Sequence, residues 1–331
     1  MKKFIEALVA FVVVVALGVG LDAWWLSNRF VNDRALPKLE TTVIVPAGTS
    51  GRDVAARLAA AGVIASPRIF ELEARLRREQ DAMRAGAFRF APHQTAADVL
   101  RQLVTGGDQL ARWVAIPEGY TNAQIAATYA ANGFASDAAL LGAFAGHIEL
   151  GGVRTPSLEG YLFPSTYLVP RSANPTAIAS EMVAQFRREL PPDAEARARA
   201  LGFTVPEVVA VASLVEREGK ADSERPLIAG VIYNRLRLGM PLQVDASLEY
   251  AFPAHKTVIT ERDLRVDSPY NTYEHTGLPP TPIANPGKAS LDAAFAPRSS
   301  QYLYYVYMGN GHHAFARTLA EHNANVTRYL R

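Results

Sequence analysis

The sequence predicts an α+β protein that follows one N-terminal transmembrane helix. Three observations lead to this prediction: an apolar segment near the start, short strands that alternate with amphipathic helices, and a later run of longer helices. A chain of 331 residues has room for two domains with substantial cores. Hydrophobic residues make up 49% and charged residues 20%, which is ordinary for a globular protein.

The composition excludes several classes of site. The sequence has no cysteines, which rules out disulfides, thiolate zinc sites, a cysteine nucleophile and lipid attachment at cysteine. Its seven histidines are scattered and form no H-E-x-x-H motif, so a metal site has little support and we expect no cofactor. The net charge of +2 gives no indication of a nucleic-acid partner.

The first predicted element is a membrane anchor within residues 1–28. The segment from Phe4 to Leu26 is close to the ~20 residues that a membrane helix needs, and Trp24 and Trp25 suit the membrane interface. A cleaved signal peptide is the alternative, because the fully apolar core is short. We favour the uncleaved anchor, because no clean small-x-small cleavage site follows. The lysines before it predict a cytoplasmic N-terminus and a periplasmic remainder.

A repeated strand–turn–helix pattern follows a polar linker over residues 29–40. The repeats span residues 43–64, 87–107 and 113–133, and each begins with a short β-branched or aromatic strand. Each helix start carries a hydroxyl residue and, three positions later, a polar residue that can complete a capping box. These pairs are Ser50 with Asp53, Thr95 with Asp98, and Thr121 with Gln124. The glycines that end the helices are Gly62, Gly106 and Gly133.

Units of this size are too small to be stable alone, so we expect them to pack together. The pattern allows two interpretations, which are a plain α+β domain and a carbohydrate-binding module that resembles LysM. Glu159 follows, among aromatic residues of "SLEGYLFPSTYLVP" at 157–170. A carboxylate beside aromatic faces is common at carbohydrate sites, and a packed loop with a capping glutamate is the alternative. An amphipathic helix is predicted from about Pro175 to Leu190, followed by a charged helical connection.

A buried central helix is predicted to begin at Pro206 and to end before Gly219. Proline is favoured in the first helical turn and glycine just after the last one. Residues 208–215 are apolar or small on every face, which is typical of a helix buried on all sides.

The end of this helix carries two glutamates, Glu216 and Glu218. Residues two apart lie roughly 200° apart around a helix, so the two carboxylates should face opposite ways. Glu218 follows the more apolar stripe, and both burial and the negative end of the helix dipole should raise its pKa. A raised pKa is what a general acid needs near neutral pH. The alternative is a solvated helix end, with one glutamate paired to Arg217 or Lys220.

The sequence of the remaining third of the chain predicts further helices, strands and one ordered loop. Ser223 can cap a helix that runs to about Leu238. An ordered loop rich in proline and glycine spans 277–287. A strand over 302–308, a Gly-Asn-Gly turn, a strand near 314–316 and a C-terminal helix complete the chain.

Several long motifs, taken together and in this order, resemble the endolytic murein transglycosylase family, also called MltG or YceG-like. The downstream motifs are "ASLVEREG", "SERPLIAGVIYNRLRLGMPLQVDASLEYA", "SPYNTYEHTGLPPTPIANPG" and "YLYYVYMGNGHHAFARTLAEHN". The upstream motifs are "VIVPAGTSGRDVAARLAAAGVI", "IPEGYTNAQIA" and "LEGYLFPSTY". The resemblance covers nearly the whole chain, including the anchor.

The resemblance implies an inner-membrane enzyme that cuts nascent peptidoglycan strands between N-acetylmuramic acid and N-acetylglucosamine. It would leave a 1,6-anhydromuramyl end, end strand elongation, and work beside cell-wall synthesis enzymes. The implied organisation is a LysM-like domain over 41–112, a connecting β-α region over 113–200, and a catalytic core over 201–331 with a lytic-transglycosylase-like active site.

The resemblance also assigns residues. Lytic transglycosylases commonly have a small residue after the catalytic glutamate, which Glu218 has and Glu216 lacks, so Glu218 is the expected acid/base and Glu216 a supporting or alternative carboxylate. The expected substrate-binding residues are Asn234, Gln243, Asp245, Tyr270, Asn271, Tyr273 and Glu159. The sequence departs from the family at Asp245–Ser247, where Asp-Pro-Thr is more usual.

Two other functions stay open at this stage. A hydrolytic muramidase could use Glu218 together with Asp245 or another acid. A non-catalytic, membrane-anchored scaffold could bind peptidoglycan without cutting it.

Overall fold

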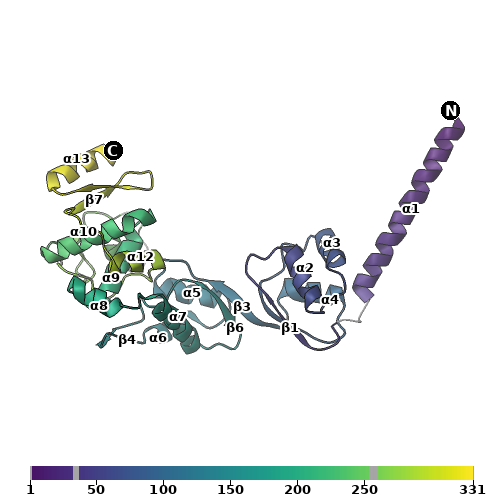
Figure 1. Ribbon diagram of the computed structural model, residues 1–331, viewed down its shortest axis with the longest axis horizontal. Helices are drawn as coiled ribbons and strands as arrows, with labels where there is room; N and C mark the ends of the chain where they lie inside the picture. The colour runs from purple at the N-terminus through teal and green to yellow at the C-terminus, as the bar shows by residue number, and fades with distance from the viewer. Residues whose placement is uncertain (1, 33–36, 253–255, 257–258, 331) are drawn as a thin grey trace. The chain divides into compact units, whose positions relative to one another are not determined.

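The computed structural model describes residues 2–32, 37–252, 256 and 259–330 (Figure 1). The chain divides into two compact units, each described separately below. Unit 1 comprises residues 1–113 and 167–171, and unit 2 comprises residues 114–166 and 172–331.

Unit 1 begins with the long helix α1 (Lys2–Asn32). Its window Phe11–Asn28 is long and apolar enough to cross a membrane, judged by length and composition, and none of that window is buried. Near the end of α1, Phe30 is 3% exposed and contributes to the core of unit 1, where its ring lies 6.0 Å from that of Phe70.

The rest of unit 1 is a four-stranded sheet with three short helices. The strand order is β1-β2-β3-β6, and β1 pairs antiparallel with β2, which pairs antiparallel with β3. The elements are β1 (Thr41–Val45), α2 (Gly51–Ala60), α3 (Pro67–Leu76), β2 (Gly86–Phe90), α4 (Ala96–Thr105), β3 (Gln109–Ala115) and β6 (Thr166–Pro170). The core of the unit gathers the inward side chains of β1 and β2 with the apolar faces of α2 and α4.

The predicted caps are present. The Ser50 hydroxyl accepts the Asp53 N–H at the start of α2, and Thr95 forms a full capping box with Asp98 at the start of α4. Helix α3 is an addition to the predicted pattern. Ser66 caps it and Pro67 is its first residue, which together are a typical helix start.

The third predicted strand–turn–helix unit is divided between the two compact units. Its strand β3 joins the sheet, whereas its helix α5 (Asn122–Ala131) belongs to unit 2 and packs against α6 (Asp137–Phe144). The capping box of α5, between Thr121 and Gln124, is present as predicted.

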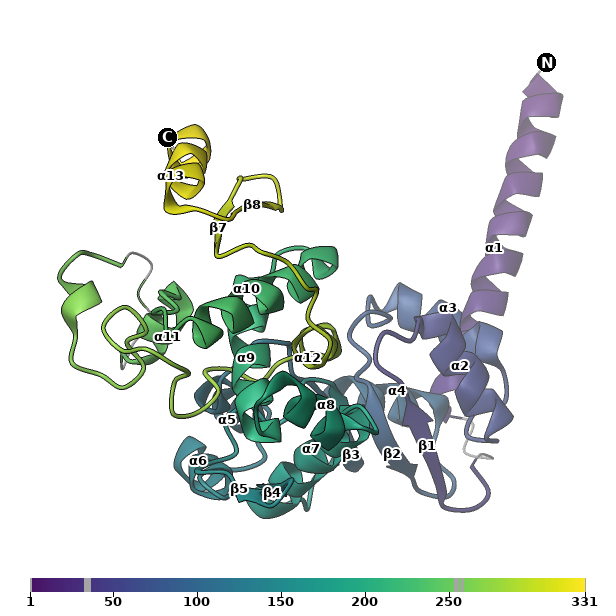
Figure 2. The same cartoon turned by 60° about the vertical axis from the view of Figure 1, so that its left-hand side comes forward.

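Unit 2 is built around the helix α9 (Val205–Glu218), which packs against α8, α10, α11 and α12 (Figure 2). Every residue from 208 to 215 is buried, as the sequence predicts. The other elements of the unit are β4 (Glu149–Leu150), β5 (Val153–Arg154), α7 (Pro175–Glu189), α8 (Ala194–Leu201), η1 (Asp222–Glu224), α10 (Arg225–Arg237), α11 (Asp245–Tyr250), η2 (Asp263–Arg265), α12 (Lys288–Phe295), β7 (Tyr304–Tyr307), β8 (His313–Ala316) and α13 (Leu319–Tyr329).

The two ends of α9 follow from local sequence. Thr204 and Glu207 form a capping box, and Pro206 lies in the first turn. At the other end, a Cβ on Gly219 would lie 3.0 Å from both Arg225 Cγ and Val215 O, so the close approach of α10 favours glycine there.

One predicted helix start is wrong. Ser223 does not cap the next helix, because residues 222–224 form the short 3-10 turn η1 and α10 begins at Arg225 with Pro226 in its first turn. The last residue of that turn, Glu224, instead extends toward the C-terminal hairpin, as described below.

Candidate active site

A pocket of about 330 Å³ lies at the C-terminal end of α9 and includes Glu218. Its walls come from α9, α10, the start of α11 with the turn before it, the 268–276 loop, the β7–β8 hairpin and α13. The polar residues that line it are Glu218, Arg235, Gln243, Asp245, Tyr273, Tyr305, Tyr307, His313 and His322. A concave site with several converging polar groups is a typical ligand site.

Burial raises the pKa of Glu218 to about 7. A hydrogen bond from the Tyr305 hydroxyl lowers this pKa, the charge of Asp245 raises it, and Lys220 and Arg217 lower it. The pKa stays above its ordinary value because burial has the largest effect. A carboxyl group with a pKa about 7 can both donate and accept a proton near neutral pH.

Glu216 has different surroundings from Glu218, as the helical spacing predicts. Its side chain is 6% exposed, and its Oε1 lies 3.4 Å from Nη1 of the buried Arg225. Its Oε2 accepts the N–H of Gly287, the N-cap of α12, at 2.9 Å. A carboxylate at this helix start is stabilised by the free N–H groups and the positive end of the dipole. Glu216 therefore fixes α12 against α9.

Three predicted substrate-binding residues, Gln243, Asp245 and Tyr273, line the pocket with Glu218. The Tyr273 hydroxyl donates a hydrogen bond to Asp245 Oδ1. Gln243 has φ of 53°, a left-handed conformation that is uncommon for residues other than glycine. Its N–H donates to Thr272 O at 2.9 Å, and this contact helps to hold the unfavourable conformation beside the pocket.

Three other predicted groove residues hold backbone or loop groups and are not among the residues that line this pocket. Asn234 Nδ2 donates to the carbonyls of residues 300 and 302, at 2.9 Å each. Asn271 is fully buried, and its Nδ2 donates to the carbonyls of residues 264 and 266. The Tyr270 hydroxyl lies 2.9 Å from that of Thr281. A role in substrate binding stays a prediction for these three.

Glu159 is buried elsewhere in unit 2, with 5% of its surface exposed. Its carboxylate accepts hydrogen bonds from Asn122 N–H, the Tyr250 hydroxyl and Asn285 Nδ2, at 3.1 to 3.2 Å. Burial raises the pKa of Glu159 to about 7, although the bonds from Asn122 and Tyr250 lower it. This carboxylate joins the start of α5 to the end of α11 and to the loop that carries Asn285, and it does not line the pocket. Its predicted contact with substrate stays a prediction.

The raised pKa of Glu159 predicts a pH-dependent stability. Between its ordinary pKa of 4.5 and its folded value of about 7, the native chain binds more protons than the unfolded chain, so the free energy of unfolding falls as the pH rises. Glutamine can replace the protonated carboxyl but cannot titrate. The free energy of unfolding of wild type should therefore fall between pH 5 and pH 8, whereas that of Glu159→Gln should not. We expect the difference between the two proteins to change in favour of Glu159→Gln by up to about 3 kcal/mol over this range. Denaturant titrations at both pH values test this, and parallel pH dependences would contradict it.

The sequence prediction missed Arg235, Tyr305 and His313. Arg235 is buried and donates to the carbonyls of residues 303, 241 and 242. Tyr305 and His313 lie on strands that were predicted correctly, but the face that each presents depends on the pairing of β7 with β8. The alternation of aromatic residues in "YLYYVYM" was the available signal.

The described residues include no group of three or more histidine, cysteine, aspartate or glutamate side chains placed to hold a metal ion.

Comparison with known proteins gives consistent matches. The model of the YceG-like family matches residues 43–328. The chain is 30% identical to the endolytic murein transglycosylase of Bacillus subtilis strain 168, over 88% of this chain and 86% of the relative. It is 28% identical to the endolytic murein transglycosylase of Streptococcus pneumoniae serotype 2, over 99% of this chain but only 65% of that longer relative.

A solved structure is similar as well. The crystal structure of a yceG-like protein from Listeria monocytogenes is 31% identical in sequence and matches with a TM-score of 0.62. The match covers 87% of this chain and 99% of that one.

Proposed function

The chain belongs to the YceG-like family, and on that premise we propose that it is a membrane-anchored lytic transglycosylase that cuts peptidoglycan strands internally. The bond cut is the one between N-acetylmuramic acid and N-acetylglucosamine, and the product carries a 1,6-anhydromuramyl end. Cutting a nascent strand in this way ends its elongation, beside the enzymes that synthesise the wall.

One observation carries this proposal. One carboxyl group of the pocket, Glu218, has a pKa raised to about 7, while its neighbour Glu216 is engaged by Arg225 and Gly287. A lytic transglycosylase needs one group that acts first as an acid and then as a base, and this is the behaviour that such a pKa favours.

Glu218 can perform both proton transfers of the reaction. Its protonated form donates the proton to the glycosidic oxygen as the bond to the muramyl C1 breaks, and the N-acetylglucosamine leaves with a free hydroxyl. The carboxylate then accepts the proton of the muramyl 6-hydroxyl as O6 bonds to C1, which closes the anhydro ring. Glu218 ends protonated again, and no water is consumed.

Asp245 supports one alternative, a hydrolytic muramidase. It lines the same pocket and its charge acts on Glu218, so the two acids could serve as a hydrolase pair. A non-catalytic scaffold is the other alternative. Mass spectrometry of glycan strands digested by the full-length chain separates all three. Anhydromuramyl ends are the expected product, reducing muramyl ends would favour the hydrolase, and binding without cleavage would favour the scaffold.

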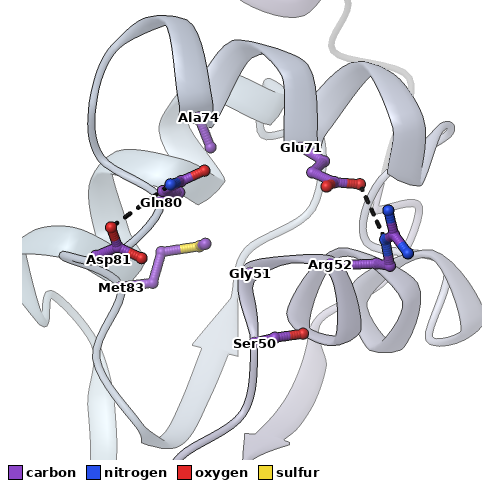
Figure 3. Close-up of a pocket in the computed structure, with 8 residues that line it drawn as sticks. All are labelled: Ser50, Gly51, Arg52, Glu71, Ala74, Gln80, Asp81 and Met83. Atoms are coloured by element: carbon purple, nitrogen blue, oxygen red, sulfur yellow. Dashed lines mark hydrogen bonds and ion pairs between the residues drawn. The ribbon is translucent and has the colours of Figure 1, made fainter.

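We propose further that α1 anchors the chain in the inner membrane with its N-terminus cytoplasmic, and that unit 1 is a LysM-like module that binds glycan. A pocket of about 340 Å³ supports the second proposal (Figure 3). It lies between the start of α2, the helix α3 and the segment that follows α3. Its lining residues are Ser50, Gly51, Arg52, Glu71, Ala74, Gln80, Asp81 and Met83.

The side chains of Gln80 and Asp81 offer hydrogen-bonding groups at this pocket (Figure 3). We expect replacement of both by alanine to weaken binding of the full-length chain to purified sacculi about 30-fold, because two hydrogen bonds of about 1 kcal/mol each would be lost. Glu79→Ala, which changes a neighbour outside the lining, is the control. A sedimentation assay measures the binding, and equal loss in both variants would contradict a glycan site here.

A further inference from the structure

The β7–β8 hairpin presents an aromatic face to the pocket. Its register pairs Tyr305 with Phe315 and Tyr307 with His313, and side chains of directly paired residues lie on the same face of a sheet. The His313 ring meets the Tyr305 ring edge-on, with centroids 5.6 Å apart, and lies at the same distance from Tyr307. The position of the Tyr305 hydroxyl at Glu218 therefore depends on the position of His313.

Glu224 joins this face to the segment between α9 and α10. Its Oε2 accepts the backbone N–H of His313 at 3.1 Å and lies 2.9 Å from His313 Nδ1, while its Oε1 lies 3.0 Å from Nδ1 of His312. The contact with His313 is shielded, because the side chains of Glu224 and His313 are 16% and 4% exposed. Burial alone would raise the pKa of Glu224, but the hydrogen bonds to the two histidines hold it below its ordinary value.

The start of the hairpin is fixed independently by α10. Asn234 donates to the carbonyls of residues 300 and 302, and Arg235 Nε donates to Leu303 O at 2.6 Å. Glu224 fixes the other strand at its first residue, His313. Tyr305 is the second residue of β7 and lies along the chain between these two attachments.

We propose that Glu224 and His313 form a positioning pair that holds Tyr305 against Glu218. The proposal deepens the proposed function and rests on it, since Glu218 is taken as the acid. Glu224 acts through His313 and Tyr305, so it is a positioning residue and has no direct part in the chemistry.

The proposal has a measurable consequence for Glu218. The groups that face it are Tyr305 on β7, Asp245 on α11, Tyr273, and the neighbouring Lys220 and Arg217. The Tyr305 hydrogen bond favours the carboxylate, whereas burial and Asp245 favour the protonated form. If Tyr305 moves away, the titration of Glu218 must shift to higher pH.

The test compares Glu224→Ala, Glu224→Gln and Tyr305→Phe in the full-length chain in detergent micelles. The Glu218 carboxyl is titrated by carbon-13 NMR with labelled glutamate, its signal being identified by its absence in Glu218→Gln. We expect Glu224→Ala and Tyr305→Phe to shift the midpoint to higher pH, and Glu224→Gln to shift it less, because one amide oxygen can still accept from His313. The double variant Glu224→Ala with Tyr305→Phe should shift the midpoint no further than Tyr305→Phe alone.

Glycan cleavage provides a second readout. We expect Glu224→Ala to lower the cleavage rate about 10- to 100-fold at the optimum pH, because Glu218 and Tyr305 would no longer be held in the catalytic geometry. The alkaline limb of the pH–rate profile should move to higher pH. Glu181→Ala, which removes a glutamate from an exposed ion pair with Arg188, is the matched control. An unshifted Glu218 titration in Glu224→Ala and Glu224→Gln would overturn the proposal, even if both lose stability. Failure of the proposed function would instead appear as a wild type that never cuts glycan, while the titration still tests the positioning pair.

Discussion

Glu218→Gln is expected to lower the rate of glycan cleavage by about 10²- to 10⁴-fold, because glutamine can neither donate nor accept the proton that the reaction moves. Glutamine is close to glutamate in size, so the pocket and its binding of glycan should persist. The measurement is the release of soluble fragments from purified sacculi, with binding of the inactive variant measured separately.

Glu216→Gln is the matched control two residues away. It weakens the contacts of Glu216 with Arg225 and Gly287, so we expect a loss of stability but a cleavage rate within about tenfold of wild type. The reverse result, an inactive Glu216→Gln and a fully active Glu218→Gln, would contradict the assignment. Wild-type cleavage should also decline above about pH 7, as Glu218 loses the proton that it must donate.

The central helix shows what the sequence could predict. The cap at Thr204, the proline after it and the glycine at 219 are local signals, and a middle that is apolar or small on every face favours burial on all sides. The 3.6-residue period separates Glu216 from Glu218 without any knowledge of the fold. These features depend on neighbours within a few residues, and the structure contains all of them.

The partners of the two glutamates could not be predicted in the same way. Glu216 meets the N–H of Gly287, 71 residues later, and Glu218 meets Tyr305 on a hairpin near the end of the chain. Such contacts are set by the packing of whole elements, and a register shift of one residue in β7 would turn Tyr305 away. The roles expected for Asn234 and Asn271 show the same limit, because polar residues that hold backbone carbonyls resemble binding residues in a sequence.

The second large effect is expected at Gly160, in the loop that follows Glu159. This glycine has φ of 90°, and a Cβ there would overlap the ring of Pro282 and lie 3.4 Å from Val209 of α9. The next residue after that proline, Ile283, donates its N–H to Ser213 of α9 at 3.1 Å. The loop of Gly160 and the loop of Pro282 thus cross at Gly160, and the crossing lies against α9, the helix that carries Glu218.

Gly160→Ala should lower the free energy of unfolding by about 2–5 kcal/mol, the sum of left-handed strain and overpacking. Gly277 separates the two contributions, since it has nearly the same φ, 92°, but nothing within 4 Å of an added Cβ. Gly277→Ala should therefore cost only the backbone strain, about 1–2 kcal/mol. Denaturant unfolding of both variants gives the difference, which is the contribution of packing at the crossing. Equal losses of unfolding free energy in the two variants would show that the two loops can move apart at Pro282 without loss of stability. The packing at this crossing would then not stabilise α9.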